Sequence, residues 1–225
     1  MVSLRNIHFG YPGTTFTIRV DALGVDQGGW LAVVGPSGSG KTTLLKIMAG
    51  LLRPQGTVEV AGVAVMNLND KALRTFRLRQ IGQVFQNFEL IPYLTVRENI
   101  QLPVKLIEGE GPEEHLEERL ESLVAPAGLE PYLQRLPANL SRGEQQRVAI
   151  CRALLLSPKV ILADEPTASL DPASKEGVMD LLLNLCRKEK ATVITVTHDM
   201  EVADLHDRIV DVSDFSKFRE GGIGE

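Results

Sequence analysis

The sequence predicts an α/β fold with a mostly parallel core sheet. Three apolar runs, residues 30–34, 159–164 and 191–197, have the continuous hydrophobic character of strands buried on both faces. Each run ends at side chains suited to binding a ligand: a glycine-rich loop, a pair of carboxylates and a histidine. Parallel sheets bind ligands at the carboxyl ends of their strands. The 225 residues are enough for one such domain with a sizeable core.

The loop after the first run has the spacing G-x-x-x-x-G-K-T, which is a phosphate-binding P-loop. Glycines let successive backbone N–H groups approach an anion, and the helix that follows adds the positive end of its dipole. Lys41 can place its charge between β- and γ-phosphates, and the Thr42 hydroxyl suits Mg²⁺. The nucleotide-binding residues predicted in this segment are Gly35, Pro36, Ser37, Gly38, Ser39, Gly40, Lys41, Thr42 and Thr43.

The other two runs end in acidic and basic groups. Asp164 can bind Mg²⁺ directly or through water, and Glu165 can orient or deprotonate a water molecule. His198, at the end of the run 191–197, is expected to sense a γ-phosphate. Lys41, Glu165 and His198 are therefore the candidate catalytic residues.

Residues 2–20 predict two strands, with apolar residues alternating from Phe16 to Val20. Tyr11 lies in the turn between them, where it either packs against the turn or stacks on a nucleobase. Further along, residues 53–56 predict a turn, residues 58–65 a short β pair, and Asn67 or Asn69 the cap of a basic helix through Arg79.

A strand over residues 81–85 ends at Gln86, and a helical region over 95–136 follows. Thr95 and Glu98 form a capping box at its start. The loop between the strand and the helical region carries four apolar residues, which are either core residues or a docking surface: Phe88, Leu90, Ile91 and Tyr93. We expect residues 87–140 to form an inserted helical subdomain, interrupted near 108–112.

Ser141 and Glu144 form a second capping box. The pattern fits a well-capped helix, or a second anion site at a helix start. Asp171 is predicted to cap a helix that runs to about Lys188, a last strand covers 209–212, and the tail is expected to be flexible over 213–225.

Composition excludes several classes of protein. The net charge of −5 and the absence of a long basic run argue against a nucleic-acid partner. No apolar run approaches the roughly 20 residues of a membrane-spanning helix, and the N-terminus lacks a signal-peptide pattern. Cys151 and Cys186 lack metal-ligand spacing and lie in apolar helical patterns, as buried free thiols in a reducing compartment do.

Together these motifs resemble the ATP-binding-cassette (ABC) ATPases over residues 2–212. The resemblance lies in the order of Tyr11, the P-loop, Gln86, Leu140-Ser141-x-Gly143-Glu144, Leu162-Ala163-Asp164-Glu165-Pro166, Ser169-Leu170-Asp171 and His198. It implies a P-loop NTPase fold with an N-terminal antiparallel β subdomain and an inserted α-helical subdomain, all in a single domain over 1–225. It also implies ATP and Mg²⁺ as ligands.

In such a family member Tyr11 would stack on adenine, and Gln86 would help Thr42 and Asp164 to bind Mg²⁺. The signature segment, Ser141, Gly143 and Glu144, would meet the γ-phosphate held by a second cassette. Glu165 would be the catalytic carboxylate and Asp171 would lie at the dimer interface. The family pattern has a glycine where this chain has Arg142. As the first residue of a helix Arg142 needs no positive φ, so we expect hydrolysis to survive.

The segments 81–86, 92–103 and 162–166 look like those of the lipoprotein-releasing and macrolide-exporter subgroup. The resemblance implies an ATPase subunit that energises a separate membrane permease, with export or extraction of a lipid-linked or hydrophobic substrate. The expected partners are a second ABC subunit, as a homodimer, and the permease. The expected location is the cytoplasm, on the inner face of the membrane. The alternatives are an importer ATPase, a soluble ABC ATPase acting on DNA or the ribosome, and a regulatory module without turnover.

Overall fold

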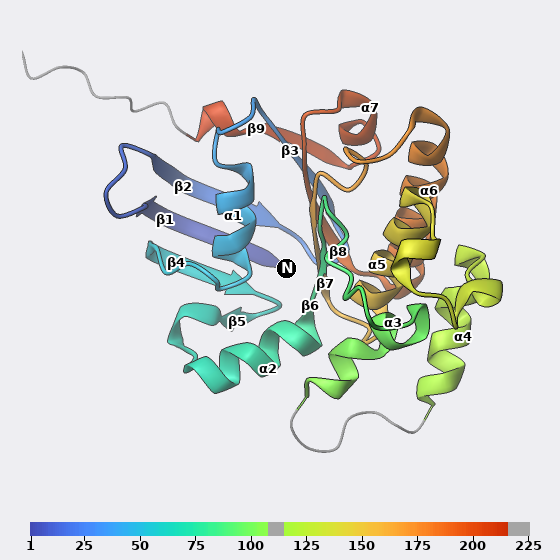
Figure 1. Cartoon of the computed structure of the whole chain (residues 1–225). Helices are drawn as coiled ribbons and strands as arrows, with labels where there is room; N and C mark the ends of the chain where they lie inside the picture. Colours follow the sequence, from blue (N-terminus) through green and yellow to red (C-terminus); the bar gives the residue numbers. More distant parts are fainter. Residues whose placement is uncertain (108–114, 216–225) are drawn as a thin grey trace, which may run out of the picture.

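The computed structural model describes residues 1–107 and 115–215. Two β-sheets stand side by side in Figure 1, with helix α1 (Lys41–Met48) between them and a group of helices on the far side of the larger sheet. The expected break near 108–112 and most of the expected flexible tail lie outside the described residues. Within the described ranges, no helix is both long and apolar enough to cross a membrane.

The larger sheet is parallel throughout, as the apolar runs predict. Its strand order is β6-β7-β8-β3-β9, and each neighbouring pair is parallel. The strands are β6 (Ile81–Val84), β7 (Val160–Asp164), β8 (Thr192–Thr197), β3 (Trp30–Val34) and β9 (Arg208–Asp211). Because all five run in one direction, the segments that follow them emerge at the same edge of the sheet.

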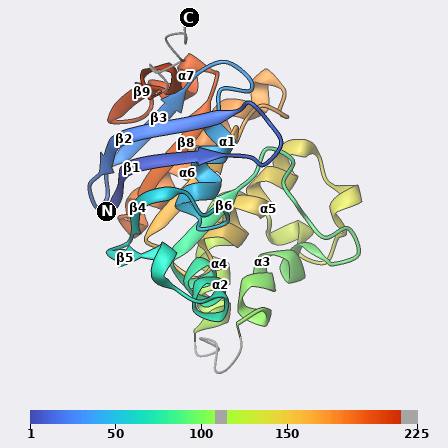
Figure 2. The ribbon, with the colours of Figure 1, turned by 90° about the vertical axis from the view of Figure 1, so that its left-hand side faces the viewer.

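The smaller sheet is antiparallel, with the order β2-β1-β4-β5, and Figure 2 shows it nearly face on. Its strands are β1 (Val2–Gly10), β2 (Thr17–Val25), β4 (Gln55–Val60) and β5 (Val63–Ala64). The turn expected over residues 53–56 is wrong in its second half, because Gln55 and Gly56 belong to β4. Gly56 has φ +96° and lies opposite a bulge in β1, where Asn6 and Ile7 together face this one residue of β4.

Helix α1 joins the two sheets through a shared core. Leu44, Ile47 and Met48 are fully buried, in one apolar cluster with residues of both sheets. Helix α2 (Asp70–Gln80) packs beside β6, and the side chain of Asn69 caps it by accepting from Ala72 N. Of the two asparagines considered for this cap, the structure therefore selects Asn69. The helix that follows the P-loop is thus held between the two sheets.

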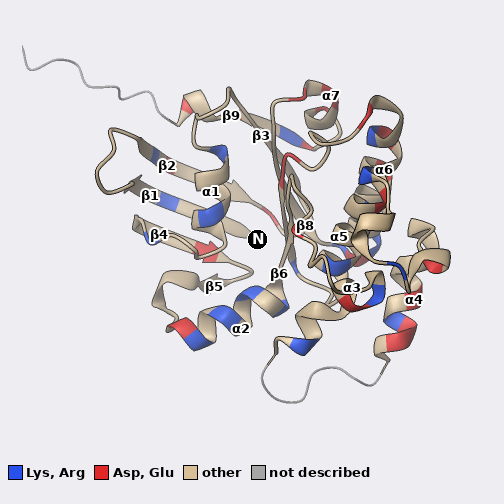
Figure 3. Cartoon of the chain, viewed as in Figure 1, with Lys and Arg blue, Asp and Glu red and all other residues tan. Residues whose placement is uncertain are grey.

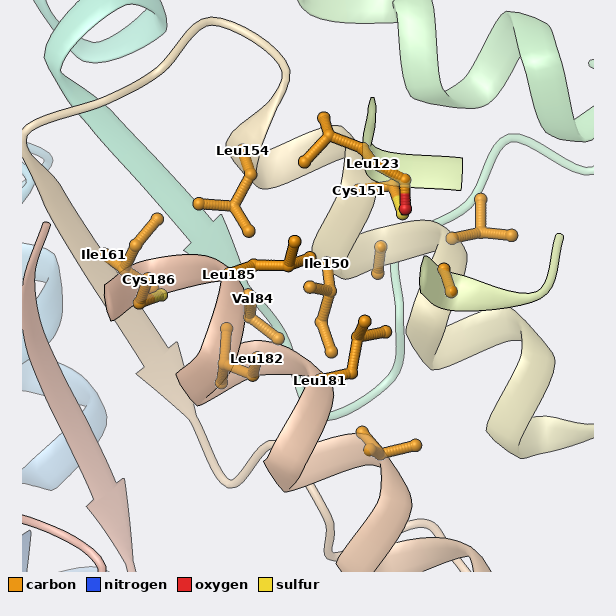
Figure 4. Packing of buried hydrophobic residues seen from close by; sticks show 14 of the residues in the cluster. Val84, Leu123, Ile150, Cys151, Leu154, Ile161, Leu181, Leu182, Leu185 and Cys186 are labelled. Carbon is orange, nitrogen blue, oxygen red and sulfur yellow. The ribbon is translucent and has the colours of Figure 1, made fainter. Parts of the chain in front are cut away.

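The other face of the parallel sheet carries the helical layer. Its helices are α3 (Val96–Lys105), α4 (Leu116–Ala127), α5 (Arg142–Leu154) and α6 (Pro172–Glu189). Figure 4 shows Ile150 and Leu154 of α5 packed between Leu123 of α4 and Leu182 of α6. Cys151 and Cys186 are buried free thiols in this layer, as expected, and burial raises the pKa of each to about 12.

Shorter elements complete the described chain. Thr95 and Glu98 form the expected capping box of α3. In the loop before it Phe88 is buried and Tyr93 is 78% exposed, so the apolar residues of this loop divide between core and surface. The remaining elements are α7 (Met200–Ala203) and 3-10 turns at Val65–Asn67, Glu130–Tyr132, Pro137–Asn139 and Val212–Asp214.

Candidate functional site

The predicted site residues gather at one edge of the parallel sheet. Gly35 follows β3, Asp164 ends β7, His198 follows β8 and Gln86 lies two residues beyond β6. The order β6-β7-β8-β3 makes these four strands consecutive neighbours. Segments separated by more than 150 residues in the chain therefore meet because the sheet aligns their carboxyl ends.

The P-loop has the conformation that its glycines allow. Gly38 has φ +77° and Gly40 φ +102°, a region that other residues rarely adopt. A Cβ on Gly40 would also lie 2.9 Å from Phe16 Cζ. Gly40 is the N-cap of α1 and offers no side chain to the first-turn N–H groups, so these donors remain for a ligand.

Lys41 is buried at the bottom of this loop. Its Nζ donates to the carbonyl oxygens of Gly35, at 2.8 Å, and Pro36, at 3.1 Å. Ser39 Oγ is also buried, and it has no hydrogen-bond partner among the described residues. An ammonium group, uncapped N–H donors and an unpaired hydroxyl are groups that a bound phosphate would satisfy.

A pocket with a volume of about 310 Å³ opens beside the loop. Its lining residues are Tyr11, Phe16, Ser37, Gly38, Gly40, Lys41, Thr42, Thr43, Gln86, Asp164 and Glu165. All but Phe16 are residues that the sequence predicts for the site. The alternation of Phe16, Ile18 and Val20 led to the prediction that Phe16 lies on a strand. Its closeness to Tyr11 in the sequence is the signal from which its place in the pocket could have been predicted.

Three oxygen-bearing side chains fit a hard divalent cation. Thr42 Oγ1 donates to Asp164 Oδ1 at 3.2 Å, and Gln86 lines the same pocket. Burial, together with the charge of Glu165, raises the pKa of Asp164, while the hydrogen bond from Thr42 opposes this. Hydroxyl, amide and carboxylate oxygens are the ligands that Mg²⁺ prefers, so the donor set fits this ion.

Glu165 combines an unusual backbone conformation with three contacts to its carboxylate. Its φ of +47° is left-handed, which costs a non-glycine residue about 1 kcal/mol or more. His198 Nδ1 lies 2.9 Å from Glu165 Oε1, Thr197 Oγ1 donates to Oε2 at 3.2 Å, and Lys41 Nζ lies 3.8 Å from Oε1. The three predicted catalytic residues therefore form one cluster, in which Thr197 is a member that sequence reasoning missed.

Tyr11 is half-buried at the turn between β1 and β2. Its ring lies edge-on to Phe9, at 5.0 Å between centroids, and 5.9 Å from Phe16. Its hydroxyl lies 3.2 Å from Thr43 Oγ1 on α1. Tyr11 thus packs against the turn and also lines the pocket, and its stacking on a nucleobase stays a prediction.

The start of α5 lies outside this pocket. Ser141 and Glu144 form the predicted capping box: Ser141 Oγ accepts from Glu144 N, and Glu144 Oε2 accepts from Ser141 N at 2.7 Å. Arg142 is the first helical residue, without a positive φ, and its Nη1 donates to Ser169 O at 3.2 Å. None of residues 141–144 is among the described residues that line the pocket.

Comparisons with known proteins agree with this arrangement. The family model described as "ABC transporter" matches residues 19–168. The chain is 41% identical over 219 residues to the uncharacterized ABC transporter ATP-binding protein YknY of Bacillus subtilis, covering 95% of this chain and 94% of YknY. It is 37% identical to the lipoprotein-releasing system ATP-binding protein LolD of Legionella pneumophila, covering 93% of each.

A solved structure is similar over almost the whole chain. It is the dimeric structure of a post-hydrolysis state of the ATP-binding cassette MJ0796 bound to ADP and Pi, a protein of Methanocaldococcus jannaschii. The TM-score is 0.82 at 39% identity, and 94% of each chain is covered. The family model, the curated relatives and this structure lead to one conclusion: the chain belongs to the ABC transporter family, as an ATP-binding subunit with ATPase activity.

Proposed function

We propose that two copies of this chain assemble head to tail and enclose two ATP molecules between them. One observation carries the proposal: the P-loop side of the pocket is complete, whereas the exposed start of α5, which would form the opposite wall, lies elsewhere on the surface. A second copy can supply that missing wall, with Ser141 and Gly143 facing the γ-phosphate and Asp171 at the interface. The dimeric MJ0796 cassette, 39% identical, supports this assembly.

Within each half of the proposed site the roles follow the geometry. Tyr11 stacks on the adenine, and the P-loop residues with Lys41 bind the phosphates. Thr42, Gln86 and Asp164 hold Mg²⁺, which neutralises charge on the phosphate oxygens. Glu165 orients and deprotonates the attacking water, and His198 beside it contacts the γ-phosphate. ATP joins the two copies, and hydrolysis weakens that contact. ATP binding and hydrolysis would thus switch the dimer between a closed and an open state.

The permease is proposed to bind a groove next to the nucleotide pocket. This groove, of about 390 Å³, lies between α2, β6, α3 and α5, and Phe85, Leu102 and Leu106 give it apolar walls. Leu106 is 54% exposed, and Arg74 and Arg77 also line the groove. Both belong to helix α2, whose ribbon carries several basic residues in Figure 3. A cytosolic segment with apolar and acidic side chains fits this surface. Gln86, next to Phe85, connects the groove to the nucleotide pocket.

The proposed cargo is a lipid-linked or hydrophobic molecule that is exported or extracted from the membrane. The 37% identity to the lipoprotein-releasing ATPase LolD supports this substrate class. The chain would then work at the cytoplasmic face of the membrane, attached through the permease. Purification of the chain with its permease, followed by ATPase assays in vesicles with lipidated and unlipidated cargo, tests the substrate class.

Complementation between two inactive variants tests the head-to-tail site. Lys41→Ala removes the phosphate-binding cation and Ser141→Arg blocks the opposite wall, so each variant alone should be inactive. Mixed dimers keep one intact site, and random pairing should restore up to about a quarter of wild-type turnover. The control mixes a chain that carries both Lys41→Ala and Ser141→Arg with a chain that carries only Glu165→Gln. No pairing of these two chains contains an intact site, so this mixture should stay inactive.

Restoration in the first mixture alone supports the shared site. No restoration, together with a Glu165→Gln variant that stays monomeric in ATP by size-exclusion chromatography, would contradict it.

A further inference from the structure

One ion pair lies behind the catalytic cluster without touching the nucleotide pocket. Lys175 Nζ, on the first turns of α6, lies 2.9 Å from Asp199 Oδ2, in the segment that follows β8. Their side chains are 36% and 19% exposed, so the pair is partly shielded from water. The contact with Asp199 raises the pKa of Lys175 and the contact with Lys175 lowers the pKa of Asp199, so both groups stay charged at neutral pH.

Asp199 is linked to Glu165 through Thr197. The backbone N–H of Asp199 donates to Thr197 Oγ1 at 3.0 Å. The Thr197 hydroxyl in turn donates to Glu165 Oε2, because a carboxylate oxygen can only accept. Asp199 also caps α7 by accepting from Glu201 N at 3.0 Å, so its position fixes the whole segment from Thr197 to the start of α7.

The same segment carries His198, which lies between Thr197 and Asp199. Its ring contacts Glu165 Oε1, and its backbone N–H donates to Oε2 at 3.4 Å. Both contacts of His198 with Glu165 therefore depend on where Asp199 holds the backbone. Glu165 itself has a left-handed φ, a conformation that persists only when surrounding contacts enforce it.

We propose that Lys175 is a positioning residue for ATP hydrolysis: by holding Asp199, it keeps Thr197 and His198 in place on Glu165. The proposal rests on the catalytic role proposed above for Glu165. Lys175 also lies on the turn that Asp171 begins, where Asp171 Oδ1 accepts from Ser174 N at 3.1 Å. The orientation of Glu165 thus depends on the first turn of α6 as well as on its own strand.

Steady-state ATPase kinetics of the full chain test this role. Lys175→Met should lower kcat about tenfold and leave KM for ATP within about twofold, because Lys175 does not contact the pocket. Lys175→Arg should keep most of the activity. Asp199→Asn should resemble Lys175→Met, and the double variant should lose little more than either single variant. Lys188→Met, an exposed lysine near the other end of α6, is the matched control.

A readout without nucleotide separates positioning from other roles. Amide hydrogen exchange over residues 197–202 should accelerate in Lys175→Met and not in Lys188→Met. In the Glu165→Gln background, Lys175→Met should leave ATP-driven dimerisation unchanged; a loss of tenfold or more in dimer affinity would make Lys175 an interface residue and overturn the proposal. Should Lys175→Met unfold below the assay temperature, Asp199→Asn breaks the same pair and decides the question.

The Glu165→Gln variant distinguishes the two levels of the proposal. Wild-type kcat in Lys175→Met, beside an inactive Glu165→Gln variant, would overturn the positioning role and leave the proposed function intact. Normal turnover in Glu165→Gln would instead overturn the role of Glu165, and the positioning role with it.

Discussion

The starts of helices α1 and α5 are both candidate anion sites in the sequence, but they differ in structure. Both are helix N-termini: the sequence predicts a phosphate site at the first, and either a well-capped helix or a second anion site at the other. Helix α1 begins after Gly40, in a left-handed conformation with no side chain that caps it. Helix α5 begins after Ser141, which shares a reciprocal capping box with Glu144.

This difference separates a complete anion site from a partial one. The first-turn N–H groups of α1 remain available, and the buried Lys41 lies beside them. At α5 the N–H of Glu144 is already bonded, and the Glu144 carboxylate adds negative charge where an anion would approach. In the proposed dimer, the start of α5 would therefore meet a phosphate that the P-loop of the other copy already neutralises. The positive charge of Arg147 partly offsets that of the carboxylate.

The largest effect is expected from a substitution that removes the catalytic carboxylate proposed on the α1 side. Glu165→Gln should lower kcat by at least about 100-fold, because the amide cannot accept the proton of the attacking water. ATP affinity should stay near the wild-type value, and ATP should trap a dimer visible by size-exclusion chromatography. A variant that turns over ATP normally would contradict the role given to this carboxylate.

Matched glycine substitutions compare the two helix starts directly. Gly40→Ala forces a Cβ onto a residue with φ +102°, 2.9 Å from Phe16 Cζ, and should weaken nucleotide binding about tenfold or more. Gly143 has no positive φ, and its Cβ would lie 3.2 Å from Ser174 Oγ, which can shift slightly. Gly143→Ala should leave nucleotide binding by the monomer unchanged, as isothermal titration calorimetry can measure. Equal losses in both variants would remove the distinction between the two starts.

Arg142 gives a smaller effect. Because Arg142 occupies an ordinary helical position, replacing it by glycine should change the ATPase rate of the assembled transporter by less than about threefold. The wild-type chain should already be active. An inactive wild-type transporter that gains activity on Arg142→Gly would show that the arginine blocks the shared site.

The smallest effect is the pH dependence of the α5 cap. Burial raises the pKa of Glu144, but hydrogen bonds from Ser141 and Tyr132 and the charge of Arg147 together outweigh it and leave the pKa below its ordinary 4.5. A depressed folded-state pKa stabilises the fold above the unfolded value, and this stabilisation is lost as pH falls through the folded value. Glu144→Gln should therefore lower the free energy of unfolding at about pH 7 by less than about 1 kcal/mol, with the difference shrinking towards about pH 4. Urea unfolding at both pH values measures it, and a difference that grows in acid would contradict the assignment.

Local sequence patterns predicted much of the fold because their causes are local. The apolar run 30–34 became β3, and the boxes at Thr95 and Ser141 capped α3 and α5. Where two patterns competed, the prediction failed: residues 53–56 carry proline and glycine, yet pairing with β1 draws Gln55 and Gly56 into β4. Strand pairing is a long-range interaction that a turn motif does not encode.

The sequence by itself determined the chemistry of this protein, because a P-loop, a carboxylate pair and a histidine each carry their function in residue type and spacing. Tertiary structure alone decided which of them meet. The parallel sheet aligned the ends of β3, β6, β7 and β8, and so brought Lys41, Asp164 and Glu165 to one pocket. It also placed Lys175 against Asp199 and left Ser141 outside the pocket. Such contacts depend on strand order and helix packing, which no local pattern in the chain specifies.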